Sequence, residues 1–308
     1  MSRSLSQTLS RVYFALQSLT GLLWWILVFA VPSVREATLG TLDAGAVAAA
    51  DLPLFVGAAA VAACGVRSAA VVNALWTVVV AIALAVYATV GGEAGWGVIL
   101  MGAATIGSLL ALSLLLLGRI PTEWIAWGPL AFRPADESRE TAVHLAVTAG
   151  QIALFWGLFL GVLPWGISVL EQRWGVAVPV PPGVPVAGAV LFFAASVLGL
   201  WSAAVMASLG RGTPLPSVMP NHLVIAGPYR WVRNPMALSG VMQAGAVGLM
   251  LGSWLVVVYA VGGSVLWNLA IRPLEERDLE ARFGDEFRGY RDAVRCWVPR
   301  PPRSIDRF

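Results

Sequence analysis

The sequence contains no lysine, two cysteines, two histidines and only 12% charged residues. Cys64 lies in an apolar run and Cys296 in the polar tail, so we expect no disulfide between them. His144 and His222 are far apart in the sequence, and no cluster has the spacing of metal ligands, so we expect no metal site. The scarcity of charge excludes an ordinary soluble domain, in which about 25% of residues are charged.

Hydrophobic sequence is abundant instead, at 58% of residues, and the mean hydropathy is +0.77. Several apolar runs approach the roughly 20 residues that a helix needs to cross a bilayer. We therefore predict an all-α, polytopic integral membrane protein with about eight transmembrane helices. The predicted spans are residues 12–31, 52–66, 69–90, 95–117, 142–163, 184–209, 236–251 and 254–271.

The first two spans each have an ambiguous boundary. The first apolar run is longer than the core of a signal peptide and lacks a clear cleavage site, so we expect it to be retained as a span. The second span is either short or contains Asp51. Because an ionisable side chain is costly inside a bilayer, we expect a short helix with Asp51 just outside it.

The arginines predict the orientation. With the N-terminus in the cytosol, eighteen of the twenty basic residues fall on the cytosolic side, and only Arg35 and Arg173 fall on the other. This asymmetry follows the positive-inside rule, so we expect an inner or plasma membrane location with both termini cytoplasmic. The net charge of +3 comes from arginines that flank spans, so we expect contact with membrane lipid and no nucleic-acid partner.

The polar stretch 119–141 predicts a division of the chain. We expect a four-helix membrane module over residues 1–118, whose role is open, a cytosolic linker over 119–141, and a second membrane module over 142–308. After Pro273, apolar residues recur every three to five positions with charges on the opposite face, which predicts an amphipathic helix at the cytosolic surface. Gly284 predicts a bend in that helix, since glycine costs about 1 kcal/mol relative to alanine.

Two polar clusters flank the last pair of predicted spans. In the first, Gly227-Pro228 is a turn signal, and Asn234-Pro235 has the pattern of a helix N-cap followed by proline. A helix N-terminus beside arginines favours the binding of an anion. The second cluster follows residue 271. Because two spans cross the membrane and return, we expect both clusters on the same side.

The second cluster supplies carboxylates. Glu275 and Glu276 follow Pro273 and open the amphipathic helix, where negative charge complements the helix dipole. Caps and membrane anchors explain each cluster when it is taken alone. Where the two clusters converge, the first can bind an anionic group and the second can bind a hydroxyl or a cationic group. This combination suits a zwitterionic cofactor with a ribose, such as S-adenosylmethionine.

These motifs resemble a known family. The run from His222 to Pro235, the double span, the Glu-Glu pair and the ending Phe283-Gly-x-x-Phe-x-x-Tyr-x-x-x-Val are similar to isoprenylcysteine carboxyl methyltransferases. Membrane phospholipid methyltransferases and small-thiol methyltransferases share this C-terminal signature. The resemblance covers about residues 141–300, is most specific from residue 222 onward, and does not reach the first four spans.

The resemblance implies an S-adenosylmethionine pocket over 222–300 and a lipophilic or membrane-associated small substrate that enters from the bilayer and accepts a methyl group on O, N or S. The cofactor-binding residues it implies are His222, Leu223, Gly227, Tyr229, Arg230, Arg233, Pro235, Glu275 and Glu276. The catalytic residues it implies are Arg233, Asn234 and Glu276.

The chain departs from the family at two of these positions. Asn234 stands where the family usually has histidine, and Ala237 stands where it has tyrosine. Both changes concern the acceptor side of the site, because an asparagine amide is no general base near pH 7 and alanine lacks the ring and hydroxyl of tyrosine.

Two other functions stay open. Arg277-Asp278 echoes a pattern at the end of NADPH-dependent membrane sterol and enone reductases. A non-enzymatic transporter or structural subunit is disfavoured, because no inverted repeat is evident and charge within the spans is scarce. Association into a homo-oligomer is compatible with the sequence.

Overall fold

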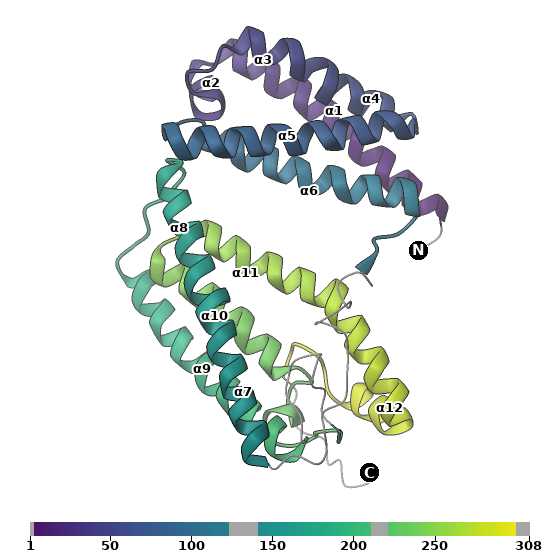
Figure 1. The fold of residues 1–308 in the computed structure, drawn as a ribbon, viewed down its shortest axis with the longest axis vertical. Coiled ribbons are helices and arrows are strands. Elements are labelled where there is room, and N and C mark those ends of the chain that lie inside the picture. Colours follow the sequence, from purple (N-terminus) through teal and green to yellow (C-terminus); the bar gives the residue numbers. More distant parts are fainter. Residues whose placement is uncertain (1–2, 123–140, 211–220, 300–308) are drawn as a thin grey trace. The chain divides into compact units, whose positions relative to one another are not determined.

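The computed structural model describes residues 3–122, 141–210 and 221–299. Within these ranges every regular element is a helix (Figure 1), which confirms the predicted all-α membrane class. The chain forms two compact units. One contains Met1–Pro121 with Val169–Ala177, and the other contains Thr122–Ser168 with Val178–Phe308.

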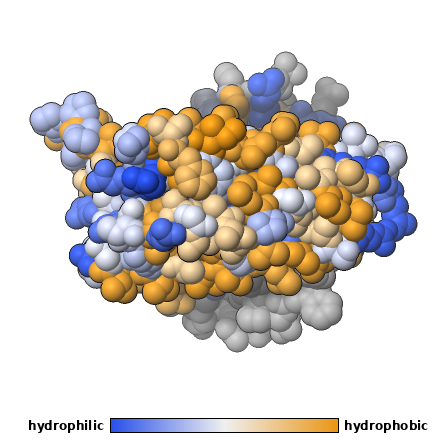
Figure 2. All heavy atoms as spheres, turned by 90° about the horizontal axis from the view of Figure 1, so that it is seen from above, coloured by the Kyte–Doolittle hydropathy of each residue, from blue (hydrophilic) through white to orange (hydrophobic). Residues whose placement is uncertain are grey.

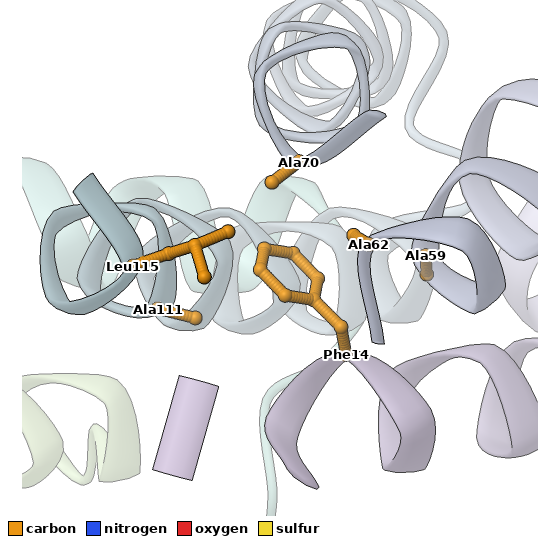
Figure 3. Close-up of a cluster of buried hydrophobic side chains, with 6 residues drawn as sticks. All are labelled: Phe14, Ala59, Ala62, Ala70, Ala111 and Leu115. Atoms are coloured by element: carbon orange, nitrogen blue, oxygen red, sulfur yellow. The ribbon is translucent and has the colours of Figure 1, made fainter. Parts of the chain in front are cut away.

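The first unit is a bundle of long apolar helices. Its elements are α1 (Arg3–Ala30), α2 (Pro32–Leu39), α3 (Ala44–Asp51), the π-helical segment η1 (Leu52–Gly57), α4 (Ala58–Ala63), α5 (Arg67–Gly91) and α6 (Gly95–Leu117). Phe14 of α1 is fully buried among small side chains of the neighbouring helices, including Ala59, Ala62 and Ala70 (Figure 3). Alanines at such positions let helices approach closely, which is the main packing device where lipid replaces water.

The spans predicted from the sequence correspond to helices. Among the described residues, seven helices are long and apolar enough to cross a membrane, and the remaining predicted span, 236–251, corresponds to the shorter helix Pro235–Leu251. Large apolar side chains such as Leu19, Ile82 and Phe193 are more than half exposed along the helix flanks. On the face seen in Figure 2, hydrophobic residues cover the middle and hydrophilic residues gather at both ends. This distribution fits helices that face lipid.

The expected boundary of the second span is wrong. The helix begins at Ala44, and Asp51 lies inside it with 3% of its surface exposed. Its two carboxylate oxygens accept hydrogen bonds from the indole nitrogens of Trp25 (2.8 Å) and Trp76 (2.7 Å). The two indole N–H groups replace the water that the carboxylate would otherwise need, which is why the helix can contain it.

The second unit holds the remaining helices of the described residues. They are α7 (Thr141–Phe155), the π-helical segment η4 (Trp156–Val162), α8 (Leu163–Arg173), α9 (Gly183–Leu209), the 3-10 turn η6 (Gly227–Arg230), α10 (Pro235–Leu251), α11 (Trp254–Leu266), the π-helical segment η7 (Trp267–Ile271) and α12 (Arg272–Ala293). The end of α8 belongs to the first unit.

Helices α9, α10 and α11 form the framework of this unit. A Cβ on Gly188 of α9 would lie 2.9 Å from the Ala246 oxygen of α10, so only glycine allows this close approach. A tight turn joins α10 to α11, in which Gly252 has φ 61° and the Ser253 hydroxyl caps α11 by accepting from Val256 N (3.2 Å). The predicted double span thus folds back on itself and brings residues 234 and 272 to the same end of the unit.

Candidate functional site

The loop before α10 ends in the helix cap that the sequence predicts. The Asn234 side-chain oxygen accepts a hydrogen bond from Ala237 N (3.1 Å), and Pro235 is the first residue of α10. Upstream, Gly227 opens the 3-10 turn with φ 53°, a backbone conformation that favours glycine. The turn directs Tyr229 inward, where it is 4% exposed.

Arg233 joins the two polar clusters. Its Nη2 donates to Glu276 Oε1 at 2.9 Å, and its Nη1 donates to the carbonyl oxygen of Arg291 at 3.0 Å. The backbone N–H of Arg233 donates to the carbonyl oxygen of Arg295 at 3.0 Å. One residue therefore connects the start of α10, the start of α12 and the tail, and its guanidinium is occupied by protein acceptors.

Asn234 makes a second connection. Its Nδ2 donates to Glu275 Oε2 at 3.2 Å, while its Oδ1 caps α10. Because both ends of the amide are used and an amide is no base near pH 7, Asn234 orients the Glu275 carboxylate and takes no part in proton transfer.

The far half of α12 closes the site from one side. The helix bends at Gly284, where φ is 54° and ψ is −123°, as the sequence predicts. After the bend, Phe287, Tyr290 and other apolar residues pack against Leu223 and the loop that precedes α10. The Tyr290 hydroxyl donates to the carbonyl oxygen of Tyr229 at 2.7 Å, so the loop and the helix hold each other in place.

Glu275 is electrostatically distinct. The pKa of this carboxyl is raised to about 7, mainly by burial and to a lesser extent by the neighbouring Glu276, while the hydrogen bond from Asn234 opposes the shift. Within the described ranges no cationic side chain forms an ion pair with Glu275, whereas Glu276 pairs with Arg233. Burial also raises the pKa values of Tyr229 and Tyr290, so both phenols stay protonated. The same part of the chain holds no group of His, Cys, Asp and Glu suited to a metal ion.

A cavity of about 620 Å³ lies within the second unit. Part of its polar lining comes from the clusters described above and includes His222, Tyr229, Asn234 and Glu275. The rest of its wall is largely apolar and aromatic and comes from α7, η4, α9, α10, α11 and η7. Residues of this wall include Phe155, Trp156, Phe159, Leu200, Met236, Ala260, Leu266 and Trp267. The cavity joins a polar, charge-bearing end to an apolar one.

The predicted site residues divide into two groups. Those that line the cavity are His222, Leu223, Tyr229, Arg233, Asn234 and Glu275. Those that do not line it are Gly227, Arg230, Pro235 and Glu276. Arg230 is exposed, Pro235 is buried in the first turn of α10, and Glu276 holds Arg233. Arg277 and Asp278, on which the reductase alternative rests, also lie outside the cavity lining.

Sequence reasoning missed the apolar part of the cavity wall. Its aromatic residues Phe155, Trp156 and Phe159 look like any lipid-facing residues of a span. Two glutamines, Gln151 and Gln243, are the exception, because an amide is unusual in an otherwise apolar span and could have drawn attention to these positions.

Fold and site together define a polytopic helical membrane protein with a cavity that joins a charged end to an apolar end. Residues 184–286 match the phospholipid methyltransferase family, which supports the resemblance predicted from the motifs. Over 94 residues the chain is 36% identical to methanethiol S-methyltransferase of Mycobacterium tuberculosis, a match that covers 30% of this chain and 36% of that relative. The chain thus matches about a third of the length of the relative. No solved structure matches the chain.

Proposed function

We propose that the protein is an integral membrane methyltransferase that transfers a methyl group from S-adenosylmethionine to a lipophilic acceptor held in the cavity. The observation that carries this proposal is the cavity itself, in which Glu275 and Asn234 face the same space as an apolar, aromatic wall. The family match over residues 184–286 supports the reaction class.

The residues at the polar end fit this cofactor. S-adenosylmethionine carries a sulfonium and an ammonium, and Glu275 offers a half-buried carboxylate without a cationic partner among the described residues. Tyr229, Tyr290 and Trp267 offer aromatic surface to a purine. A volume of about 620 Å³ lies in the range typical of small-molecule sites.

When bound, the cofactor supplies an electrophilic methyl group; its sulfur–methyl bond breaks as the acceptor–methyl bond forms. The chain's contribution to such an in-line displacement is alignment of donor and acceptor. Asn234 orients Glu275, and the Arg233–Glu276 pair fixes the start of α10 against α12. We therefore assign Arg233, Asn234 and Glu276 positioning roles, and Glu275 contact with the bound cofactor.

The proton of a neutral acceptor must leave before or during the transfer. Glu275, whose pKa is raised to about 7, and His222 are the groups of the cavity that could take it. A thiol is a suitable first acceptor to test, because its pKa near 8.5 makes it easy to ionise. The similarity to a methanethiol S-methyltransferase supports the same choice.

We also propose an inner or plasma membrane location with both termini in the cytoplasm, and substrate entry from the bilayer. Eighteen of the twenty arginines then lie on the cytoplasmic side. Anionic lipid is the partner expected for these arginines, and a homo-oligomer is compatible with the exposed apolar flanks. Cysteine labelling of each terminus in intact and opened cells tests this orientation; labelling of the termini from opposite sides would contradict it.

The central test uses the full chain purified in detergent. We expect S-adenosylhomocysteine and S-adenosylmethionine to raise the midpoint of thermal unfolding, and NADPH to leave it unchanged. Replacement of Glu275 by alanine should weaken the binding of S-adenosylmethionine about tenfold or more, because the cavity then loses its carboxylate for the cationic cofactor. Isothermal titration with S-adenosylmethionine measures this loss.

Asp278 provides the matched acidic control, because it lies about one turn further along α12 and outside the cavity lining. Its replacement by alanine should leave the affinity unchanged. Stabilisation by NADPH alone would point to the reductase class and overturn the proposal, as would equal losses of affinity in the two variants.

A further inference from the structure

A second cavity, of about 720 Å³, lies within the first unit. Its walls come from α2 and the turn after it, from the loop between α5 and α6 with the first turn of α6, and from the residues that follow α8. Three charged side chains line it, those of Arg35, Glu36 and Glu93. The proposed methyl transfer uses none of these residues, and the family match over 184–286 includes none of them.

Glu93 is held in a fixed orientation at this cavity. Its Oε2 accepts hydrogen bonds from the Tyr87 hydroxyl (2.9 Å) and from both the backbone N–H (3.1 Å) and the hydroxyl (3.1 Å) of Thr41. These bonds, led by that of Tyr87, lower the pKa of Glu93, so its carboxylate is ionised near neutral pH. The side chain is exposed, and no residue in the described ranges donates to its other oxygen, Oε1. A ligand that carries a hydrogen-bond donor can therefore reach this oxygen.

The backbone beside Glu93 is strained. Ala94 has φ 61°, and it is the only non-glycine residue with a positive φ in the part of the chain that the structure describes. Its neighbour Gly95 packs so closely that a Cβ there would collide with the carbonyl oxygen of Trp174. Strained backbone persists where the surrounding structure holds it, and it collects at binding sites. Here the strain accompanies a carboxylate that is fixed on a cavity wall.

Arg35 supplies positive charge to the same cavity. In the proposed orientation it is one of two arginines outside the cytoplasm, against the positive-inside trend. The other, Arg173, has a structural role, because its Nε and Nη2 donate to the carbonyl oxygens of Thr89 (2.8 Å) and Val90 (2.6 Å). The Arg35 guanidinium is exposed and forms no hydrogen bond or ion pair with any described residue. It is therefore available to an anionic ligand, and a guanidinium matches the geometry of phosphate and carboxylate.

The cavity lies where lipid-facing helices end. α1 ends just before the first cavity residue, and α5 ends just before the loop that contains Glu93. Near these ends Phe29 and Val90 are more than half exposed. Trp96 lines the cavity and is 41% exposed, and tryptophan is enriched at the boundary between membrane and water. Because phosphate head groups occupy this depth of a bilayer, phosphate is the anion most available to Arg35.

We propose that this cavity binds a zwitterion in which a primary ammonium is joined to a phosphate, with the phosphate on Arg35 and the ammonium on Glu93 Oε1. This chemistry is found both in the head of a zwitterionic phospholipid and in the free, soluble head-group compound. Glu36 adds a second carboxylate that attracts the ammonium. A quaternary ammonium fits less well, because it has no N–H to donate to Glu93. The site goes beyond the proposed methyl transfer and does not depend on the cofactor.

The test measures binding of two soluble probes, glycerophosphoethanolamine and glycerophosphocholine, to the full chain in an uncharged detergent without cofactor. The probes share the phosphate and differ by three methyl groups on the nitrogen. We expect the wild-type protein to bind the ethanolamine probe about five- to tenfold more tightly, the effect of one charge-assisted hydrogen bond. Isothermal titration measures both affinities.

Two variants separate the two ends of the site. Glu93→Gln keeps an acceptor for Tyr87 and Thr41 but loses the charge, so it should bind the two probes equally. Arg35→Gln should weaken the binding of both probes about tenfold and keep the preference between them, because both probes carry the phosphate. Arg35 contacts no described side chain through its guanidinium, so this substitution leaves the fold intact.

Arg67→Gln is the matched control, because Arg67 is an exposed arginine at the opposite end of α5, in the same unit and outside the cavity lining. It should bind both probes as the wild-type protein does. Equal binding of the two probes by the wild-type protein overturns the proposal, and so does a preference that persists in Glu93→Gln. A loss in Arg67→Gln as large as that in Arg35→Gln also contradicts it.

A third probe distinguishes the two sources of the ligand. Lysophosphatidylethanolamine carries the same head on a single acyl chain. If its affinity exceeds that of the soluble probe by more than its partition into empty micelles explains, the site binds a membrane lipid. If the excess is absent while the soluble probe keeps its preference, the site binds the free zwitterion; both results support the same recognition by Arg35 and Glu93.

Discussion

Asp51 in the first unit and Glu275 in the second are both carboxylates removed from bulk water, and their surroundings differ. Two indole N–H groups occupy both oxygens of Asp51, and the residue lies inside a helix. Glu275 receives one hydrogen bond, from Asn234, and faces a cavity. A carboxylate whose bonds are complete stabilises a fold, whereas one with an oxygen left over toward a cavity can bind a ligand.

The largest effect on stability is expected from substitution of Asp51. Replacement of Asp51 by alanine leaves the buried indole N–H of Trp25 and the partly buried indole N–H of Trp76 without an acceptor. We expect the free energy of unfolding to fall by about 2–4 kcal/mol. Denaturant unfolding in detergent measures the loss.

Asp43 provides the control, since it caps the exposed start of the same helix by accepting from Ala46 N (2.7 Å). Asp43→Ala should cost about 1 kcal/mol. A loss of S-adenosylmethionine affinity in folded Asp51→Ala protein would contradict the purely structural role that we assign to Asp51.

A pH titration tests the role of Glu275 in this comparison. The pKa of this carboxyl is raised to about 7 in the folded protein, above its ordinary value. Between about pH 4.5 and 7 the folded state therefore still holds a proton that the unfolded state has already released. The contribution of Glu275 to stability is fully present below this window and is lost as the pH rises through 7.

Thermal unfolding between pH 4 and 8 should show this loss in the wild-type protein and not in Glu275→Gln, which keeps an acceptor for Asn234. Affinity for the cationic S-adenosylmethionine should change in the opposite sense and increase as Glu275 ionises through pH 7. An identical pH dependence of stability in the two proteins would show that Glu275 titrates with an ordinary pKa.

The smallest expected effect concerns the bend that closes the site. Gly284 has a positive φ, so Gly284→Ala should cost about 1 kcal/mol of unfolding free energy. Gly262→Ala is the control, because Gly262 lies inside α11 in helical conformation with open space around it. That substitution should be neutral or slightly stabilising. Equal effects in the two variants would show that the bend does not require glycine.

Much of the fold could be predicted because membrane helices leave strong signals. Runs of apolar residues marked the spans, Asn234-Pro235 marked the start of α10, and Gly284 marked the bend in α12. Asp51 could not be placed correctly, because its acceptance inside a helix depends on Trp25 and Trp76, which come from other helices. The charge of Asp51 indicates that its burial costs free energy, but the sequence does not reveal the hydrogen-bond partners that offset this cost.

The residues that meet at the candidate site could be predicted only where they cluster in the sequence. Glu275 and Asn234 lie at the two ends of a double span, so topology brought them together. Glu276 was predicted to contact the cofactor, but it is turned toward Arg233, a difference of one residue along a helix, or about 100° of rotation.

The bonds of Arg233 also set an order of events during synthesis. Its partners, the carboxylate of Glu276 and the carbonyl groups of Arg291 and Arg295, are all made after the two spans that follow Arg233. While the spans before them enter the membrane, the guanidinium and the N–H of Arg233 have only water or lipid headgroups to bind. The cavity therefore acquires its final wall only once α12 has been made, and a chain interrupted before α12 would contain the preceding helices without the enclosed site.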